Sequence, residues 1–162
     1  MQDKSDEELA QELLESGLDY INQRRYPEAI RHFKEAVKKD PECFEAYMHL
    51  ADTYMEMEQF DSARWAYQKA LELDEDHVES WYRLGDICIN GSDYDEAEKC
   101  LIRATKIEPD KAAAWNTLGT VYMEQEKYIK AKESFKKALE IDPDYNQASF
   151  NLDKIKNIDI SK

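Results

Sequence analysis

Residues 112–145 read AAAWNTLGTVYMEQEKYIKAKESFKKALEIDPDY, and this stretch contains the pattern that decides the fold. Its first half has apolar or small residues at the i, i+3, i+4 and i+7 spacing of one helix face: Trp115, Leu118, Gly119 and Tyr122. Its second half has another such face, followed by a proline: Ala131, Phe135, Ala138 and Pro143. Because proline cannot continue a helix, the stretch predicts two helices that pair as a hairpin.

The same pattern recurs every 34 residues, so the chain divides into four ungapped frames: 10–43, 44–77, 78–111 and 112–145. The departures are small, since the third frame differs only at Cys88 and Leu101 and the second has Glu75 in place of proline. This pattern resembles the tetratricopeptide repeat (TPR), whose unit has 34 residues. The resemblance implies an all-α fold, a right-handed TPR superhelix (α-solenoid) of four helix hairpins plus a C-terminal capping helix.

We therefore expect residues 1–9 to extend the first helix, the four frames to be TPR 1 to TPR 4, and residues 146–162 to form a capping helix and tail. Ser5 and Glu8 fit a capping box at the start of a helix over 6–22. Further helices are predicted over about 27–39, 43–56, 61–73 and 146–157. Gly91 is expected to take the left-handed conformation in the turn after a first helix.

Three of the four glycines, Gly17, Gly85 and Gly119, share one repeat position inside a helix. Glycine destabilises a helix interior by about 0.5 to 1 kcal/mol relative to alanine. Its recurrence therefore predicts that two helices approach closely there.

The chain has 22 basic and 36 acidic side chains, a net charge of -14. This charge argues against a nucleic-acid partner and against an anionic membrane surface. No apolar run reaches the ~20 residues of a membrane span, and the first residues lack the apolar stretch of a signal peptide, so a cytoplasmic location is expected. The three cysteines are expected to be reduced thiols.

Catalytic and metal-binding motifs are missing from the sequence. His32, His49 and His77 lie far apart in the chain, and none pairs with a cysteine at metal-ligand spacing. A Gly-rich phosphate loop and a nucleophile elbow are also missing. We therefore predict a protein that is not an enzyme and binds no cofactor or metal.

The TPR resemblance implies that the first helix of each hairpin lines a concave groove that binds a partner. The inward-facing positions are Leu14, Leu18, Glu45, Met48, His49, Asp52, Glu56, Glu79, Tyr82, Arg83, Asp86, Asn90, Asn116, Thr117, Thr120 and Met123. Because these side chains are mostly acidic or apolar, the expected partner is a protein or peptide, such as a helix, with basic and apolar residues. Packing between repeats is an alternative role for Met123.

Some co-chaperone TPR domains bind the C-terminal carboxylate of heat-shock chaperones with a clamp of Lys, Asn, Asn, Lys and Arg. Read across the first three hairpins, the corresponding positions are Leu14, Leu18, His49, Glu79 and Arg83. Read across the last three, they are Met48, Asp52, Arg83, Ala113 and Thr117. One arginine among acids is a poor carboxylate site, so a heat-shock chaperone tail is not the expected partner.

Two apolar residues occupy repeat positions that are mostly charged or polar in the other frames. Trp65 corresponds to Arg31, Lys99 and Glu133. Ile102 corresponds to Lys34, Gln68 and Lys136. Together they predict a second, convex surface for self-association or another partner. The alternative is a half-buried tryptophan that lies along its own helix.

The main prediction is thus a protein-binding scaffold. Two alternatives remain open at this stage, namely a structural TPR protein that forms homo-oligomers and the recognition arm of a larger enzyme.

Overall fold

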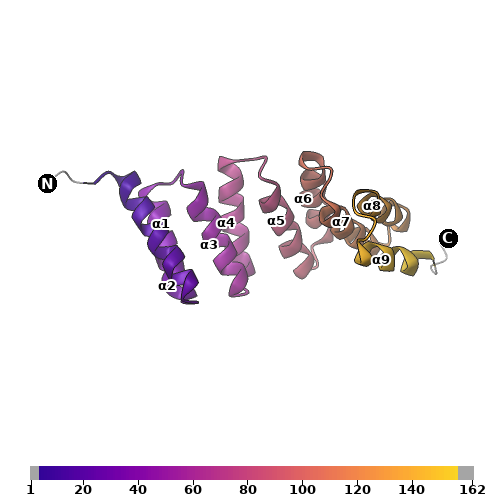
Figure 1. Cartoon of the computed structure of the whole chain (residues 1–162), viewed down its shortest axis with the longest axis horizontal. Coiled ribbons are helices and arrows are strands. Elements are labelled where there is room, and N and C mark those ends of the chain that lie inside the picture. Colours follow the sequence, from indigo (N-terminus) through magenta and orange to yellow (C-terminus); the bar gives the residue numbers. More distant parts are fainter. Residues whose placement is uncertain (1–3, 157–162) are drawn as a thin grey trace. The chain divides into compact units, whose positions relative to one another are not determined.

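The computed structural model describes residues 4–156, which form nine α-helices and contain no strand (Figure 1). In chain order the helices are α1 (Asp6–Asn22), α2 (Tyr26–Lys39), α3 (Phe44–Glu56), α4 (Phe60–Leu73), α5 (Val78–Asn90), α6 (Tyr94–Ile107), α7 (Ala112–Glu124), α8 (Tyr128–Ile141) and α9 (Asn146–Lys156). The predicted all-α fold is confirmed, and the helix ends predicted within the described range agree to within one residue. The predicted tail beyond residue 156 lies outside the described residues.

Helix α1 begins with the predicted capping box. The Glu8 backbone N–H donates to Ser5 Oγ over 3.1 Å, and the Ser5 backbone N–H donates to Glu8 Oε2 over 2.9 Å. Asp6, Glu7 and Glu8 fill the first turn, where the helix dipole favours negative charge. Local sequence thus determines where α1 begins.

Glycine lets the two helices of a hairpin approach each other. A Cβ atom added to Gly119 of α7 would lie 2.6 Å from Cε1 of Phe135 on α8. One added to Gly85 of α5 would lie 2.9 Å from Cγ of Leu101 on α6. Both distances are shorter than the ~3.5–4.0 Å of an ordinary carbon contact. The close approach predicted from the recurring glycine is confirmed.

The turn inside every hairpin has one non-glycine residue at positive φ: Arg24, Glu58, Ser92 and Glu126, with φ of 58°, 55°, 58° and 59°. In the third hairpin the Ser92 N–H donates to the Ile89 carbonyl (2.9 Å) and the Asp93 N–H to the Cys88 carbonyl (2.8 Å), which is a Schellman motif. The prediction that Gly91 takes the left-handed conformation is wrong. Gly91 lies one residue before the position that these two hydrogen bonds force into it.

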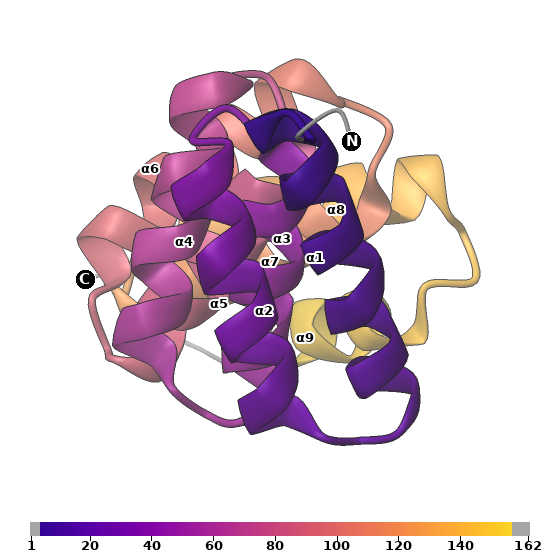
Figure 2. The same cartoon turned by 90° about the vertical axis from the view of Figure 1, so that its left-hand side faces the viewer.

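The chain divides into two compact units, residues 1–80 and residues 81–162, and α5 crosses the boundary. In the first unit α1 packs against α2, and α3 packs against α2 and α4; Figure 2 shows α1 and α2 side by side. In the second unit α7 packs against α6 and α8, and α9 packs against α8 and α7. Ala148 and Ile155 of α9 are fully buried, so α9 caps the last hairpin.

Candidate functional site

The charges of the chain are separated by helix class. The first helices of the hairpins, α1, α3, α5 and α7, carry 12 acidic side chains and one basic one, Arg83. The second helices, α2, α4, α6 and α8, carry 13 basic and 9 acidic side chains. Nine of the 12 acidic side chains lie on α1 and α3, so the separation is strongest in the first two hairpins.

Helix α3 has an acidic stripe in the first unit. Glu45, Asp52 and Glu56 are all exposed, and their i, i+7 and i+11 spacing places them on one face of the helix. Asp52 Oδ1 accepts a hydrogen bond from the Tyr67 hydroxyl at 2.5 Å, which holds the carboxylate against α4. The hydroxyl donor adds no positive charge to the stripe.

The apolar and aromatic residues beside this stripe are partly used for packing. Met48 Sδ accepts a hydrogen bond from Ser80 Oγ at 3.1 Å. The His49 ring stacks on Phe33, with ring centroids 5.7 Å apart. Both side chains, like that of Leu18, remain half-buried. Leu14, another predicted groove residue, is buried at 6% exposure, so it packs the core.

In the second unit two predicted groove residues contact each other across α5 and α7. The Tyr82 hydroxyl lies 3.3 Å from Thr117 Oγ1, and Lys111 Nζ lies 5.1 Å from the centre of the Tyr82 ring. Asn116 is only 3% exposed and its Oδ1 accepts from Asn151 Nδ2 of α9 at 3.4 Å. The capping helix thus uses a residue that the sequence assigned to the groove.

The other predicted groove residues keep some accessible surface. Arg83 and Asn90 are exposed, whereas the half-buried members are Glu79, Asp86, Thr120 and Met123.

Trp65 and Ile102 are in different units. Trp65 is 43% exposed, and its indole ring meets the Tyr47 ring edge-on, with centroids 6.0 Å apart. Ile102 is half-buried. In the first unit, therefore, an aromatic side chain of a second helix covers an aromatic side chain of the first helix beside it.

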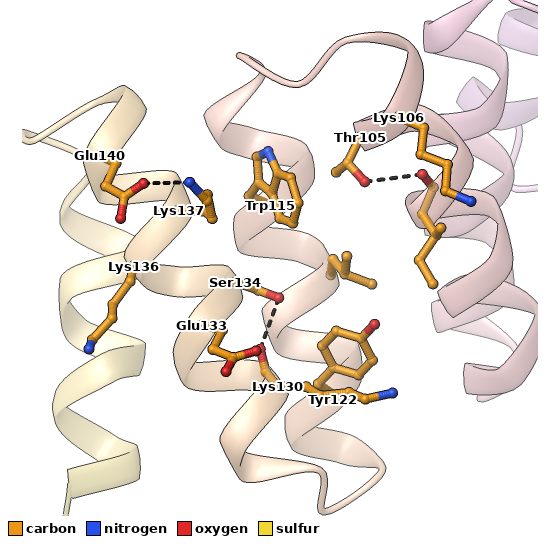
Figure 3. Close-up of a pocket in the computed structure, with 12 residues that line it drawn as sticks. Thr105, Lys106, Trp115, Tyr122, Lys130, Glu133, Ser134, Lys136, Lys137 and Glu140 are labelled. Atoms are coloured by element: carbon orange, nitrogen blue, oxygen red, sulfur yellow. Dashed lines mark hydrogen bonds and ion pairs between the residues drawn. The ribbon is translucent and has the colours of Figure 1, made fainter.

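Ile102 lines a pocket in the second unit. The sequence analysis did not predict this pocket. This α6–α8 pocket has a volume of about 620 Å³. Its lining residues are Ile102, Thr105, Lys106, Trp115, Leu118, Tyr122, Lys130, Glu133, Ser134, Lys136, Lys137 and Glu140 (Figure 3). None of them belongs to the predicted groove. The only sequence signal for the pocket was the unusual isoleucine.

A half-buried carboxylate, Glu98, forms an ion pair with an exposed lysine beside this pocket. Lys127 Nζ donates to Glu98 Oε2 at 2.7 Å, which joins the turn before α8 to α6. Burial disfavours the Glu98 carboxylate, but hydrogen bonds from Lys127 and Gln125 outweigh this effect, so the pKa of Glu98 is lowered. Burial, together with the Glu98 charge, raises the pKa of Tyr122 to about 12. Tyr122 is therefore a neutral floor residue of the pocket.

The described residues contain no group of three or more His, Cys, Asp or Glu side chains placed to hold a metal ion. Cys43, Cys88 and Cys100 are thiols and do not form disulfides with one another. Among residues 4–156, no helix has the length and apolar character needed to cross a membrane.

A tetratricopeptide repeat family, described as the cilia and flagella-associated protein 70 C-terminal domain, matches residues 6–145. The chain belongs to this family. The resemblance predicted from the repeat pattern is thereby confirmed, and TPR domains are in general noncatalytic modules for protein–protein interaction.

Curated proteins match this TPR domain over short segments. Hsp70-Hsp90 organizing protein 1 of Arabidopsis thaliana is 41% identical over 46 residues, which cover 28% of this chain and 8% of that protein. Stress-induced-phosphoprotein 1 of Caenorhabditis elegans is 54% identical over 35 residues, covering 22% of this chain and 11% of that protein. The match thus spans about a tenth of each relative's length.

Solved structures match the TPR domain over most of its length. A crystal structure of the MamA protein has a TM-score of 0.87 at 26% identity and covers 91% of this chain and 81% of that chain. The Pseudomonas aeruginosa pilF structure has a TM-score of 0.75 at 23% identity and covers 94% of this chain and 69% of that chain. At 23% identity, the similarity to the pilF structure shows a shared fold and nothing more.

Proposed function

We propose that the chain is a noncatalytic protein-interaction module whose first helices bind a partner segment with basic and apolar side chains. The supporting observation is the separation of charge by helix class, with 12 acidic side chains and one basic one on the first helices. A stripe of like charges repels itself. A cationic partner relieves this repulsion and is also steered toward the stripe.

The strongest part of the proposed surface is α3. Glu45 and Asp52 are seven residues apart, or about 10 Å along the helix axis, and Glu56 lies about 6 Å further on. Three carboxylates at this spacing match basic side chains on successive turns of a partner helix. Met48 and Leu18, both half-buried, offer apolar contact beside them. Leu14 and Asn116 are left out of the proposed surface because they are buried.

The names of the curated relatives refer to the organisation of the chaperones Hsp70 and Hsp90. We do not propose the tail of a chaperone as a partner of this chain. The clamp positions expected from the TPR resemblance include Leu14, which is buried, and Glu79, which is acidic. A carboxylate partner would meet repulsion on α3 rather than a cationic clamp.

The test uses fluorescence anisotropy with a labelled synthetic helix of lysine and leucine and a matched helix of glutamate and leucine. The double variant Glu45→Gln with Glu56→Gln should weaken binding of the basic helix about two- to thirtyfold, since each exposed charge contact contributes about 0.2–1 kcal/mol. Higher salt should weaken it as well, because the Debye length is about 8 Å at physiological ionic strength.

The matched control is Asp61→Asn with Glu72→Gln, which removes two exposed carboxylates from α4 instead. It should leave the affinity for the basic helix nearly unchanged. Equal weakening by both double variants would mean that the basic helix responds to net charge rather than to the first helices, and tighter binding of the acidic helix would overturn the proposed partner chemistry.

A further inference from the structure

The α6–α8 pocket has a counterpart two repeats earlier in the chain. A shift of 68 residues relates Trp115 to Tyr47 and Glu133 to Trp65. In the first unit Trp65 covers Tyr47 with an edge-on contact of 6.0 Å between ring centroids. In the second unit Glu133 occupies the position that corresponds to Trp65, and it has no aromatic ring. Trp115 therefore lines an open pocket at the place where Tyr47 is covered.

A second substitution makes the floor of this pocket apolar. Ile102 takes the place of Lys34, whose Nζ lies 5.7 Å from the centre of the Tyr54 ring in the first unit. In the second unit the floor instead combines two aliphatic side chains with two aromatic ones: Ile102, Leu118, Trp115 and Tyr122. Its volume of about 620 Å³ lies within the range of about 300–1,000 Å³ that is usual for ligand pockets.

The edge of the pocket is cationic, in contrast to the acidic chain around it. Four lysines and two glutamates line it. Lys137 pairs with Glu140 at 2.7 Å, and Lys130 lies 3.9 Å from Glu98 and over the Tyr122 ring. Lys106 on α6 is exposed and has no ion-pair partner within residues 4–156. Figure 3 shows Trp115 and Tyr122 between Lys106 on one side and Glu133 on the other.

We propose that the α6–α8 pocket is a second binding site, which takes an aromatic side chain flanked by carboxylates on a segment of a partner protein. The aromatic ring fills the place above Trp115 that Trp65 fills above Tyr47. The flanking carboxylates meet the lysine edge. Aromatic pairs contribute attraction beyond simple burial, and tryptophan and tyrosine are frequent anchors of protein interfaces. The chain would then bind a basic partner at the acidic stripe of its first helices and an acidic partner at the α6–α8 pocket.

The probe is a labelled synthetic peptide, DEEWEED, whose binding is measured by fluorescence anisotropy. Two control peptides are measured in the same way: DEEAEED, which lacks the aromatic residue, and KKKWKKK, which lacks the carboxylates. We expect DEEWEED to bind and the other two to bind at least about tenfold more weakly, because each lacks one of the two required chemistries. Equal affinity for DEEWEED and DEEAEED would overturn the proposal, since the pocket floor would then contribute nothing.

Two substitutions at one position give opposite expectations. Glu133→Trp copies the arrangement of Trp65 and should close the pocket, with a loss of at least about tenfold in affinity for DEEWEED. Glu133→Gln removes a repelling charge without closing the pocket and should raise the affinity about two- to fivefold. Thermal melting checks that both variants fold. If folded Glu133→Trp binds DEEWEED as well as the wild type does, the pocket is not the site.

Charge reversal on the lysine edge has a matched control. Lys106→Glu should weaken the binding of DEEWEED about three- to tenfold. Lys132 is an exposed lysine of α8 outside the pocket lining, so Lys132→Glu should leave the affinity for DEEWEED unchanged. Equal weakening by both would reduce the effect to net charge and overturn the proposal. Light scattering tests whether a second copy of the chain fills the pocket instead. If DEEWEED does not bind, and the wild type self-associates while Glu133→Trp stays monomeric, the occupant is a second copy of the chain and the proposal is overturned.

Discussion

Replacing Gly119 by alanine tests whether glycine sets the distance between α7 and α8. The added Cβ would lie 2.6, 2.7 and 2.9 Å from three ring carbons of Phe135. An ordinary carbon contact is about 3.5–4.0 Å long, so the methyl group overlaps the ring by roughly 1 Å. Phe135 is completely buried, and a ring packed on all sides cannot move away without disturbing its neighbours.

Two opposing effects determine the size of the change. Overfilling a packed core costs about 1–3 kcal/mol. Alanine in place of glycine inside a helix returns about 0.5–1 kcal/mol. We therefore expect Gly119→Ala to lower the free energy of unfolding by about 1 kcal/mol, near the middle of the range of about 0–2.5 kcal/mol that these two effects allow.

Gly85→Ala is the matched comparison, because its neighbour is a flexible aliphatic side chain. The added Cβ would lie 2.9 Å and 3.1 Å from Cγ and Cδ2 of Leu101. Leu101 is fully buried too, but its contact is about 0.3 Å longer than that of Phe135. The strain should therefore be smaller and more of it should be offset by the helix-propensity gain, so that Gly85→Ala costs less stability than Gly119→Ala. The second repeat has Ala51 at this position, fully buried, so alanine is acceptable where the facing helix allows it.

The assay is urea unfolding followed by far-ultraviolet circular dichroism and by tryptophan fluorescence. Two probes are needed because repeat arrays do not always unfold in one step. The double variant Gly119→Ala with Phe135→Leu should recover part of the loss, since it places leucine opposite alanine, the same pairing that Gly85→Ala creates with Leu101. The reasoning is refuted if Gly119→Ala is as stable as the wild type while Gly85→Ala is clearly less stable.

Two other predictions concern α9 and Tyr122. Ile155→Ala should lower the free energy of unfolding by about 2–5 kcal/mol, because Ile155 is 1% exposed. Phe150→Ala on the same helix should change it by less than about 0.5 kcal/mol, because Phe150 is 62% exposed. Urea midpoints compare the two variants, and equal losses would contradict the capping role of α9. The pKa of Tyr122 is raised to about 12 by burial and by Glu98, so its stabilising contribution is complete below the unfolded pKa of about 10 and is lost as pH rises through about 12. Urea midpoints over this pH range should fall less steeply for Tyr122→Phe than for the wild type, and identical slopes would argue against the shift.

Sequence reasoning located the helices well because proline, glycine and the apolar spacing all recur every 34 residues. It failed at Gly91 for a specific reason. The left-handed residue of each hairpin turn is chosen by the two hydrogen bonds that close the helix, and these place Arg24, Glu58, Ser92 and Glu126 at the same repeat position. Residue type alone pointed to the glycine one position earlier.

The surfaces were harder to predict than the helices. The acidic stripe of α3 follows from helical spacing, so the exposure of Glu45, Asp52 and Glu56 could be expected. The burial of Asn116 depends on where α9 docks, because Asn151 reaches it from 35 residues away. The α6–α8 pocket depends on which side chain covers Trp115, a question of packing between three helices that no spacing rule answers.

The separation of charge gives the first unit a permanent electric dipole moment. Helices α1 and α3, which contact each other, carry nine carboxylates and no Lys or Arg, whereas α2 and α4 carry six basic and four acidic side chains. Near a charged partner such a unit experiences a torque as well as an attraction. The torque acts over about one Debye length, roughly 8–10 Å near physiological salt, so the unit can turn its α1 and α3 side toward a cationic partner before any contact forms. Orientation in the encounter complex is thus selected by the field of the unit and not only by the fit of its surfaces.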